Sequence, residues 1–325
     1  MGGADEMSHK HDGWGWMLAV DFFFAGMGGA MLVIAGIGDL FLGDGQTSVL
    51  GNFAGAVFIA VGACFLILEL GRPFQAFRVF MNPKTILTFG AWNMTLAIIA
   101  GILFASFGIT LLPWSKLILL RKFFAAFCLI FGLVVATYPG ALLARNKARP
   151  FWNGPGIMVL FFLSSFITGM AGHILCGYII GESSWFIVNG YIVGSFSSLV
   201  LQDLPHLTAI LLLFQLIFWS GYIWIKWSGS TEREAKAAQR WISGDLSASF
   251  KLGFILLGTI VPIVLLLFTN PVVHSVGACL ALLGGMIMRY LVVRAGEDRT
   301  WLPGELKYRS RLPVGNEDFL KAWKS

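Results

Sequence analysis

Residues 17–32, MLAVDFFFAGMGGAML, place one carboxylic acid, Asp21, in a stretch that is otherwise apolar, aromatic or glycine. The stretch lies in a longer apolar run, and about 20 such residues in a helix cross the hydrocarbon core of a bilayer. An ionisable group inside a span costs on the order of 2.5–3.5 kcal/mol, so Asp21 is a functional candidate. An interhelical hydrogen bond that only fixes packing is the alternative. Gly26, Gly28 and Gly29 give the same helix a small-residue face, which favours a closely packed helix bundle.

The composition of the whole protein is that of an integral membrane protein. Its 325 residues are 57% hydrophobic and 12% charged, and the mean hydropathy is +0.78, whereas soluble domains carry about 25% charged residues. We predict an all-α fold: a bundle of eight transmembrane helices over residues 1–294 and a polar tail, 295–325, for partner docking or membrane-surface contact. The eight predicted spans are 15–41, 50–70, 86–108, 123–143, 156–180, 205–227, 250–268 and 275–294.

Two further segments resemble spans only in part. Residues 185–200, WFIVNGYIVGSFSSLV, are apolar but short and are broken by Gly190 and Gly194, so we expect a re-entrant or interfacial segment there, with a ninth span as the alternative. Residues 231–243, TEREAKAAQRWIS, predict a charged interfacial helix with Trp241 at the level of the lipid headgroups.

The distribution of the cations predicts the orientation in the membrane. With eight spans, 20 of the 23 Lys and Arg residues fall on one side, Arg289 being assigned to the tail, and only Lys116, Arg121 and Lys122 fall on the other. The positive-inside rule then places both termini in the cytoplasm. We expect the protein in the plasma membrane. The net charge of +6 therefore reflects topology, and we expect no nucleic-acid partner.

Polar side chains of several predicted spans converge on one half of the membrane. A pocket with apolar walls and a few fixed polar groups suits a lipid-soluble quinone. Tyr138 could donate a hydrogen bond to a quinone carbonyl, and Asp21 could exchange the proton, so these two are the predicted catalytic residues. The predicted quinone-binding residues are Asp21, Phe24, Glu69, Arg72, Trp92, Asn93 and Tyr138. An interfacial anchor remains the alternative for Tyr138, and an ion pair at a helix end remains the alternative for Glu69 with Arg72.

The cysteines and histidines bear on metal sites and on proton movement. Each cysteine stands alone within an apolar run, so we expect buried thiols and no metal site in this protein. Histidines on facing helices could ligate a b-type haem, which leaves a haem-bearing cytochrome subunit as an alternative. The cysteines are Cys64, Cys128, Cys176 and Cys279, the histidines in question are His173, His206 and His274, and a candidate proton path comprises Glu69, Asp39, His173 and Asp203.

Two loop regions carry a resemblance to a known family. LELGRPFQAFRVFMNPKTILTFGAWNMTL (68–96) and YPGALLARNKARPFWNGP (138–155) resemble the NrfD/PsrC family of polysulfide-reductase membrane subunits, and the likeness covers roughly residues 15–180. The resemblance implies two four-helix bundles without haem and a site for menaquinone or another quinone. It implies a respiratory oxidoreductase in which this protein exchanges electrons with a ferredoxin-like iron–sulfur subunit. That subunit would in turn exchange electrons with a molybdopterin catalytic subunit or a multihaem cytochrome.

The same resemblance implies roles for particular residues. The family's quinone site uses polar groups of the first helix and a tyrosine at the end of the fourth, which match Asp21 and Tyr138 here. This sequence departs from the polysulfide-reductase pattern, because Leu18 and Asp21 stand where that pattern has Asn and His. Relatives dock their partner on the outer face, whereas the basic loops here favour a cytoplasmic partner. The alternative is that basic docking loops override the usual charge rule. A proton-coupled transporter is the rival function from another class.

Overall fold

The structure is a computed structural model that describes residues 15–42, 49–69, 77, 79–81, 85–109, 111–146, 149–182, 203–229 and 232–296. Eight helices in these ranges are long and apolar enough to cross a membrane, so the predicted all-α, eight-span fold is confirmed. Arg72, the segment 185–200 and the tail from 297 lie outside the described residues. The elements are α1 (Trp16–Ile37), η1 (Gly38–Leu42), α2 (Val49–Glu69), α3 (Ile86–Ser106), α4 (Ile118–Ala144), α5 (Gly156–Glu182), α7 (Leu204–Trp227), α8 (Glu232–Ile242), η4 (Ser249–Ile260), α9 (Val261–Leu266) and α10 (Pro271–Ala295).

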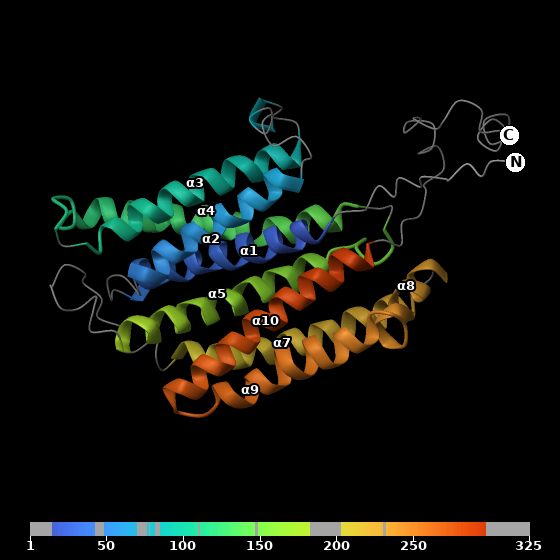
Figure 1. Cartoon of the computed structure of the whole chain (residues 1–325). Coiled ribbons are helices and arrows are strands. Elements are labelled where there is room, and N and C mark those ends of the chain that lie inside the picture. The colour runs from blue at the N-terminus through green and yellow to red at the C-terminus, as the bar shows by residue number, and fades with distance from the viewer. Residues whose placement is uncertain are drawn as a thin grey trace, which may run out of the picture.

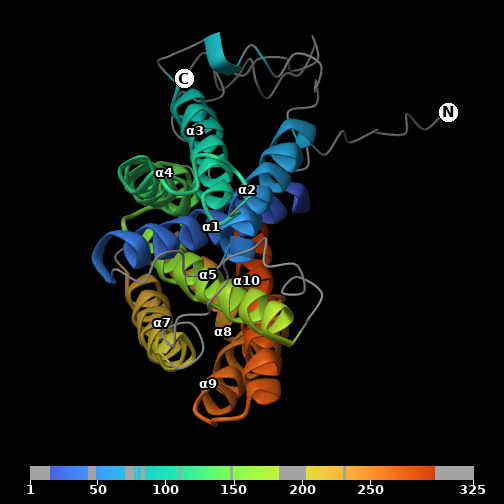
Figure 2. The same ribbon diagram turned by 90° about the vertical axis from the view of Figure 1, so that its left-hand side faces the viewer.

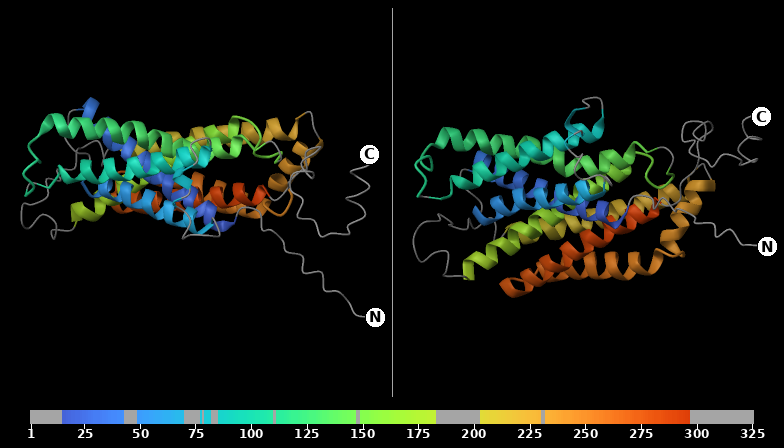
Figure 3. Two further views of the ribbon diagram at one scale, coloured as in Figure 1. Left: turned by 90° about the horizontal axis from the view of Figure 1, so that it is seen from above. Right: turned by 45° about the horizontal axis from the view of Figure 1, so that its top comes forward.

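The spans form two groups of four that meet along α1 and α5 (Figure 1). Helices α1 to α4 pack on one another, and α5, α7, the η4–α9 span and α10 form the second group, which Figure 2 shows from the end of the molecule. The helices run nearly along one direction and give the molecule an elongated shape, while α8 lies at one end of the bundle (Figure 3). Below, this is called the α8 end.

Glycines let α1 approach its neighbours backbone to backbone. A Cβ atom at Gly28 would lie 2.4 Å from the Gly55 carbonyl oxygen of α2, and one at Gly29 would lie 2.8 Å from the Gly132 carbonyl oxygen of α4. Side chains at these points would force the helices apart. Gly28 and Gly29 of the predicted small-residue face therefore pack on α2 and α4, whereas Gly26 lies against Ser165 of α5 and Arg289 of α10.

Several cations expected in loops belong to helices instead, and Arg121 and Arg289 are two of them. Helix α4 begins at Ile118, not at 123, so Arg121 lies in its first turn and pairs with Asp39 at 3.0 Å. Arg289, expected in the tail, lies within α10 and is fully buried. Hydrogen bonds to other helices, described below, hold the Arg289 guanidinium in the bundle, whereas the cation count alone places it in water.

The predicted helix near 231–243 is present as α8, but the location expected for Trp241 is wrong. Trp241 is fully buried and stacks on Phe151, with ring centroids 4.6 Å apart and planes 15° apart. Lys226 anchors the start of this region by donating to the Pro150 carbonyl at 2.9 Å and pairing with Glu234 at 2.7 Å. The apolar face of α8 thus packs onto the end of the bundle and not onto lipid headgroups.

Substitution of Gly29 tests the α1–α4 contact. We expect Gly29→Ala to lower the thermal unfolding temperature of the purified protein, because overpacking of this kind costs about 1–3 kcal/mol. Gly221→Ala in α7 is the matched control, since no atom lies within 4 Å of the added Cβ. Equal unfolding temperatures for the two variants, measured by size-exclusion chromatography after heating, would contradict the contact.

Cysteine labelling tests the predicted orientation. In a background without native cysteines, Asn146→Cys and Gln239→Cys at the α8 end should react with a membrane-impermeant maleimide only from the cytoplasmic side of sealed vesicles. Lys116→Cys, exposed at the opposite end, should react only from the other side. The reverse pattern would show that the cation count predicts the wrong orientation.

Candidate functional site

Asp21 lies in the second turn of α1 and faces α2. Its side chain is 2% exposed, and its Oδ1 atom has no hydrogen-bond partner within the described residues. The α2 residue opposite is Gly62, where an added Cβ would lie 3.1 Å from Oδ1. Most buried polar atoms in proteins are hydrogen-bonded, so an acid without a partner, held against a glycine, requires an explanation.

Tyr138 lies near the end of α4, at the same end of the bundle. Its side chain is 6% exposed, and its hydroxyl also has no partner in the described part of the protein. The ring packs on Gly90 of α3, where an added Cβ would lie 2.5 Å from Cζ. The Asp21 carboxyl and the Tyr138 hydroxyl are close enough to interact electrostatically. The structure thus brings the two predicted catalytic residues to one level of the membrane.

An apolar cavity of about 320 Å³ lies at the same end of the bundle, between α2, α3 and the residues at positions 77, 79 and 80, and its described lining includes neither Asp21 nor Tyr138. Its α2 wall includes Ala63, the neighbour of Gly62, and its α3 wall includes Ala91, the neighbour of Gly90. Two lining residues are thus the chain neighbours of the glycines against which Asp21 and Tyr138 pack. Its lining residues are Ala63, Leu66, Ile67, Phe77, Val79, Phe80, Leu87, Ala91, Met94, Thr95 and Ile98.

Arg289 is a buried cation that the sequence analysis did not place in the bundle. Its Nε donates to the Phe22 carbonyl at 2.9 Å, and its Nη1 and Nη2 donate to the hydroxyls of Ser164 at 2.9 Å and Ser165 at 3.1 Å. The guanidinium also lies over the ring of Phe23, 5.6 Å from the ring centre. The sequence does carry a signal for this burial, because the arginine stands inside an apolar run six residues before the end of its helix.

The other predicted quinone-binding residues occupy varied positions at the same end. Asn93 is buried, but its amide donates to the Phe89 carbonyl of its own helix at 2.7 Å. Trp92 is 49% exposed and packs against Phe80. It therefore lies on the outside of the helix bundle, and not between the helices as we expected.

Two more of these residues have identifiable neighbours. Phe24 packs against Phe58 of α2, with ring centroids 5.7 Å apart. Glu69 accepts a hydrogen bond from the Gly15 amide at 2.7 Å, which joins the end of α2 to the start of α1. The Glu69 carboxylate thus binds backbone at a helix end.

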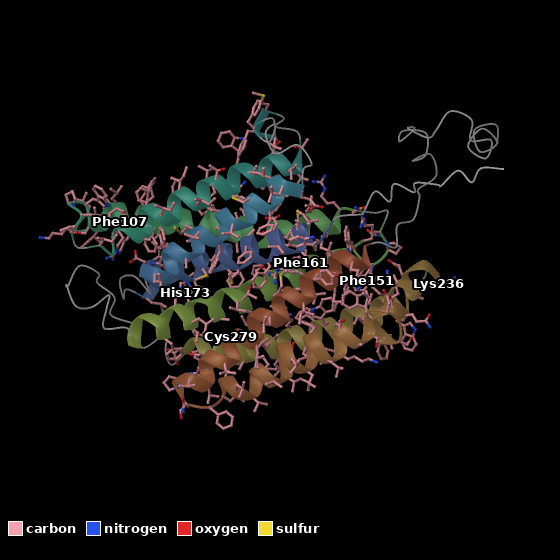
Figure 4. The ribbon with its side chains drawn as sticks, viewed as in Figure 1. Phe107, Phe151, Phe161, His173, Lys236 and Cys279 are labelled. Carbon is pink, nitrogen blue, oxygen red and sulfur yellow. The ribbon has the colours of Figure 1, made fainter. Side chains whose placement is uncertain are left out.

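The residues of the expected proton path are widely separated. Asp39 is paired with Arg121 at the end of α1 opposite to Asp21. His173 is fully buried in α5 and bonds through Nε2 to the Met31 carbonyl at 2.9 Å, and Figure 4 shows it farther from the α8 end than Phe161 and Phe151. Asp203 is exposed at the start of α7. No continuous hydrogen-bonded path connects these groups within the described residues.

The cysteines and histidines offer little as metal ligands in the described residues. Cys128 and Cys176 are buried as expected, but Cys64 and Cys279 are exposed on the helix surface, which corrects that expectation. His274 bonds to the Tyr178 hydroxyl at 2.8 Å and to the Phe268 carbonyl. Within the described ranges, no three His, Cys, Asp or Glu side chains are grouped in a way that could hold a metal ion.

Comparisons with known proteins agree with this architecture. The family model described as "Polysulphide reductase, NrfD" matches residues 6–299, which is most of the sequence. The protein is also 27% identical over 321 residues to the C subunit of the polysulfide reductase of Wolinella succinogenes, with 87% of this sequence and 94% of that subunit covered.

Proposed function

Because the chain belongs to the NrfD family of multi-pass membrane proteins, we propose that it is the quinone-reactive membrane subunit of a respiratory oxidoreductase complex. The observation that carries the proposal is the placement of Asp21 and Tyr138 in one half of the bundle, each with a buried oxygen that lacks a partner in the described residues. An apolar cavity of about 320 Å³ lies between α2 and α3, the two helices on which these side chains pack. A cavity of this size lies within the range of small-molecule sites.

The residues present suit a quinone, which supplies two-electron, two-proton redox chemistry when it is bound. The Tyr138 hydroxyl is free to donate a hydrogen bond to a carbonyl oxygen. The Asp21 carboxyl is free to accept a proton at Oδ1 or to return it. Burial excludes water from both groups, so the proton stays on the side chain that holds it until an acceptor arrives.

Electrons leave or enter through partner subunits in this proposal. The relative from Wolinella succinogenes is one subunit of a polysulfide reductase, and a ferredoxin-like iron–sulfur subunit is the partner that the family resemblance implies. A molybdopterin catalytic subunit or a multihaem cytochrome would complete the assembly. We place the partner at the α8 end, because Asp21 and Tyr138 lie in that half of the bundle and electron transfer favours a short path.

Replacing the carboxyl tests its part in proton exchange. We expect Asp21→Asn to reduce quinol-linked electron transfer by the assembled complex at least tenfold, since the amide cannot take up the proton and general acid–base groups contribute roughly 10²–10⁴-fold. Lys116→Gln, at an exposed site at the opposite end of the bundle, is the control and should leave turnover unchanged. Wild-type turnover in an intact Asp21→Asn complex would remove Asp21 from the mechanism.

Replacing the phenol tests the hydrogen bond. Tyr138→Phe should weaken binding of a quinone-analogue inhibitor about tenfold, because loss of a donor to a buried acceptor costs about 1–3 kcal/mol. The matched control is Tyr290→Phe, since Tyr290 is 42% exposed on α10. Fluorescence titration of the membrane complex measures both affinities. Equal affinities for wild type and Tyr138→Phe would show that the phenol makes no contact with the ligand.

A further inference from the structure

Two opposite charges lie deeper in the described spans than any others. Among the Asp, Glu, Lys and Arg residues of the eight spans, only Asp21 and Arg289 lie five or more positions from the end of their span. Both lie in the same half of the membrane, because the Arg289 side chain bonds to the carbonyl of Phe22, the residue after Asp21. Each charge alone would be costly to bury at this depth.

Arg289 has no ion-pair partner within the described residues. Its hydrogen bonds there all end on neutral oxygens: the carbonyls of Phe22 and Gly285 and the hydroxyls of Ser164 and Ser165. These bonds satisfy donors of the guanidinium but supply no negative charge. The described part of the fold therefore keeps a buried cation without a paired anion, an arrangement that proteins usually avoid.

The bonds of Arg289 extend to the backbone beside both candidate catalytic residues. One reaches the carbonyl of Phe22, next to Asp21. Another reaches Ser165, whose hydroxyl in turn donates to the Ala136 carbonyl at 3.1 Å, two residues before Tyr138. A single side chain of the second helix group thus fixes the two helices, α1 and α4, that carry the site.

We propose that Arg289 is the positioning and counter-charge residue of the site: it fixes the α1 and α4 backbones and stabilises the Asp21 carboxylate once its proton has left. The proposal rests on the proposed function only in treating Asp21 as the group that exchanges the proton. The elements packed against α1 carry other titratable groups: Cys64 and Glu69 on α2; Arg121, Lys122, Cys128 and Tyr138 on α4; His173, Cys176, Tyr178 and Glu182 on α5; His274, Cys279, Tyr290 and Arg294 on α10; and Asp39 on η1. Of the cations among them, Arg121 and Lys122 lie at the far end of the bundle, and Arg294 lies in the last turn of α10, five residues beyond Arg289.

The expected size of the effect follows from Coulomb's law. Two unit charges separated by about the width of one helix, about 10 Å, at an effective dielectric constant of about 20 shift a protonation equilibrium by about one pH unit. The attraction favours the carboxylate, so removing the cation should move deprotonation of Asp21 to higher pH. A side chain that only fills space would have no such effect.

Infrared difference spectroscopy of the purified complex tests the charge directly and needs no turnover. The carboxylic C=O band of Asp21, assigned by its loss in Asp21→Asn, is followed against pH. We expect Arg289→Gln to raise the pH at which half of this band is lost by about one unit. Arg289→Lys should bring that pH most of the way back to the wild-type value. Ser165→Ala, which removes the hydrogen bonds of Ser165 to Arg289 and to the Ala136 carbonyl and keeps the cation, serves as the packing control and should shift the midpoint much less.

Three results would overturn the proposal: an unchanged midpoint in Arg289→Gln, an equal shift in Ser165→Ala, or an Asp21 band that does not titrate in either protein. If Arg289→Gln does not assemble, the comparison of Arg289→Lys with wild type decides, because a preserved charge must preserve the midpoint. Failure of the proposed function would be seen separately, as absence of quinone-analogue binding by the wild-type complex. Analogue binding with no shift of the band would remove the role of Arg289 alone.

Discussion

Close backbone contact around α1 is the constraint on which the rest of the structure depends. This helix is buried on nearly all sides, and glycines at its contacts with α2 and α4 bring the carbonyl of one helix against the Cα of another. Lipid offers no hydrophobic driving force between helices, so packing and interhelical hydrogen bonds must hold them together. Because α1 also contacts α5 and α10, it joins the two groups of four spans.

The site follows from that packing. Glycines at positions 62 and 90 leave room for Asp21 and Tyr138 to lie flat against α2 and α3, and the neighbours of those glycines line the apolar cavity. A larger side chain at either glycine would occupy the space in which the carboxyl or the phenol lies. The two buried oxygens without partners in the described residues are therefore a product of close helix approach, and the chemistry proposed for them requires the same closeness.

Much of the fold could be predicted from the sequence, because the bilayer requires long apolar helices and the sequence contains eight apolar runs of sufficient length. The convergence of Asp21 and Tyr138 could also be predicted, since topology alone sets the depth of a residue in its span. What could not be predicted depends on which way a side chain points. Trp92 faces outward and Trp241 is buried, and the helical periodicity of nearly uniform apolar runs does not distinguish these cases. Arg289 was misplaced because a count of cations by loop cannot recognise a guanidinium bonded to neutral oxygens.

The ion pair between Asp39 and Arg121 has a mechanical consequence for the other end of the same helices. It joins α1 to α4 at 3.0 Å, while the contact of Gly29 with Gly132 joins them near mid-membrane. Two helices that are joined at two separate points can neither slide past each other nor pivot freely. Asp21 and Tyr138 lie beyond the contact of Gly29 with Gly132, so their spacing is set before any ligand arrives. Binding then incurs little entropic penalty for aligning them.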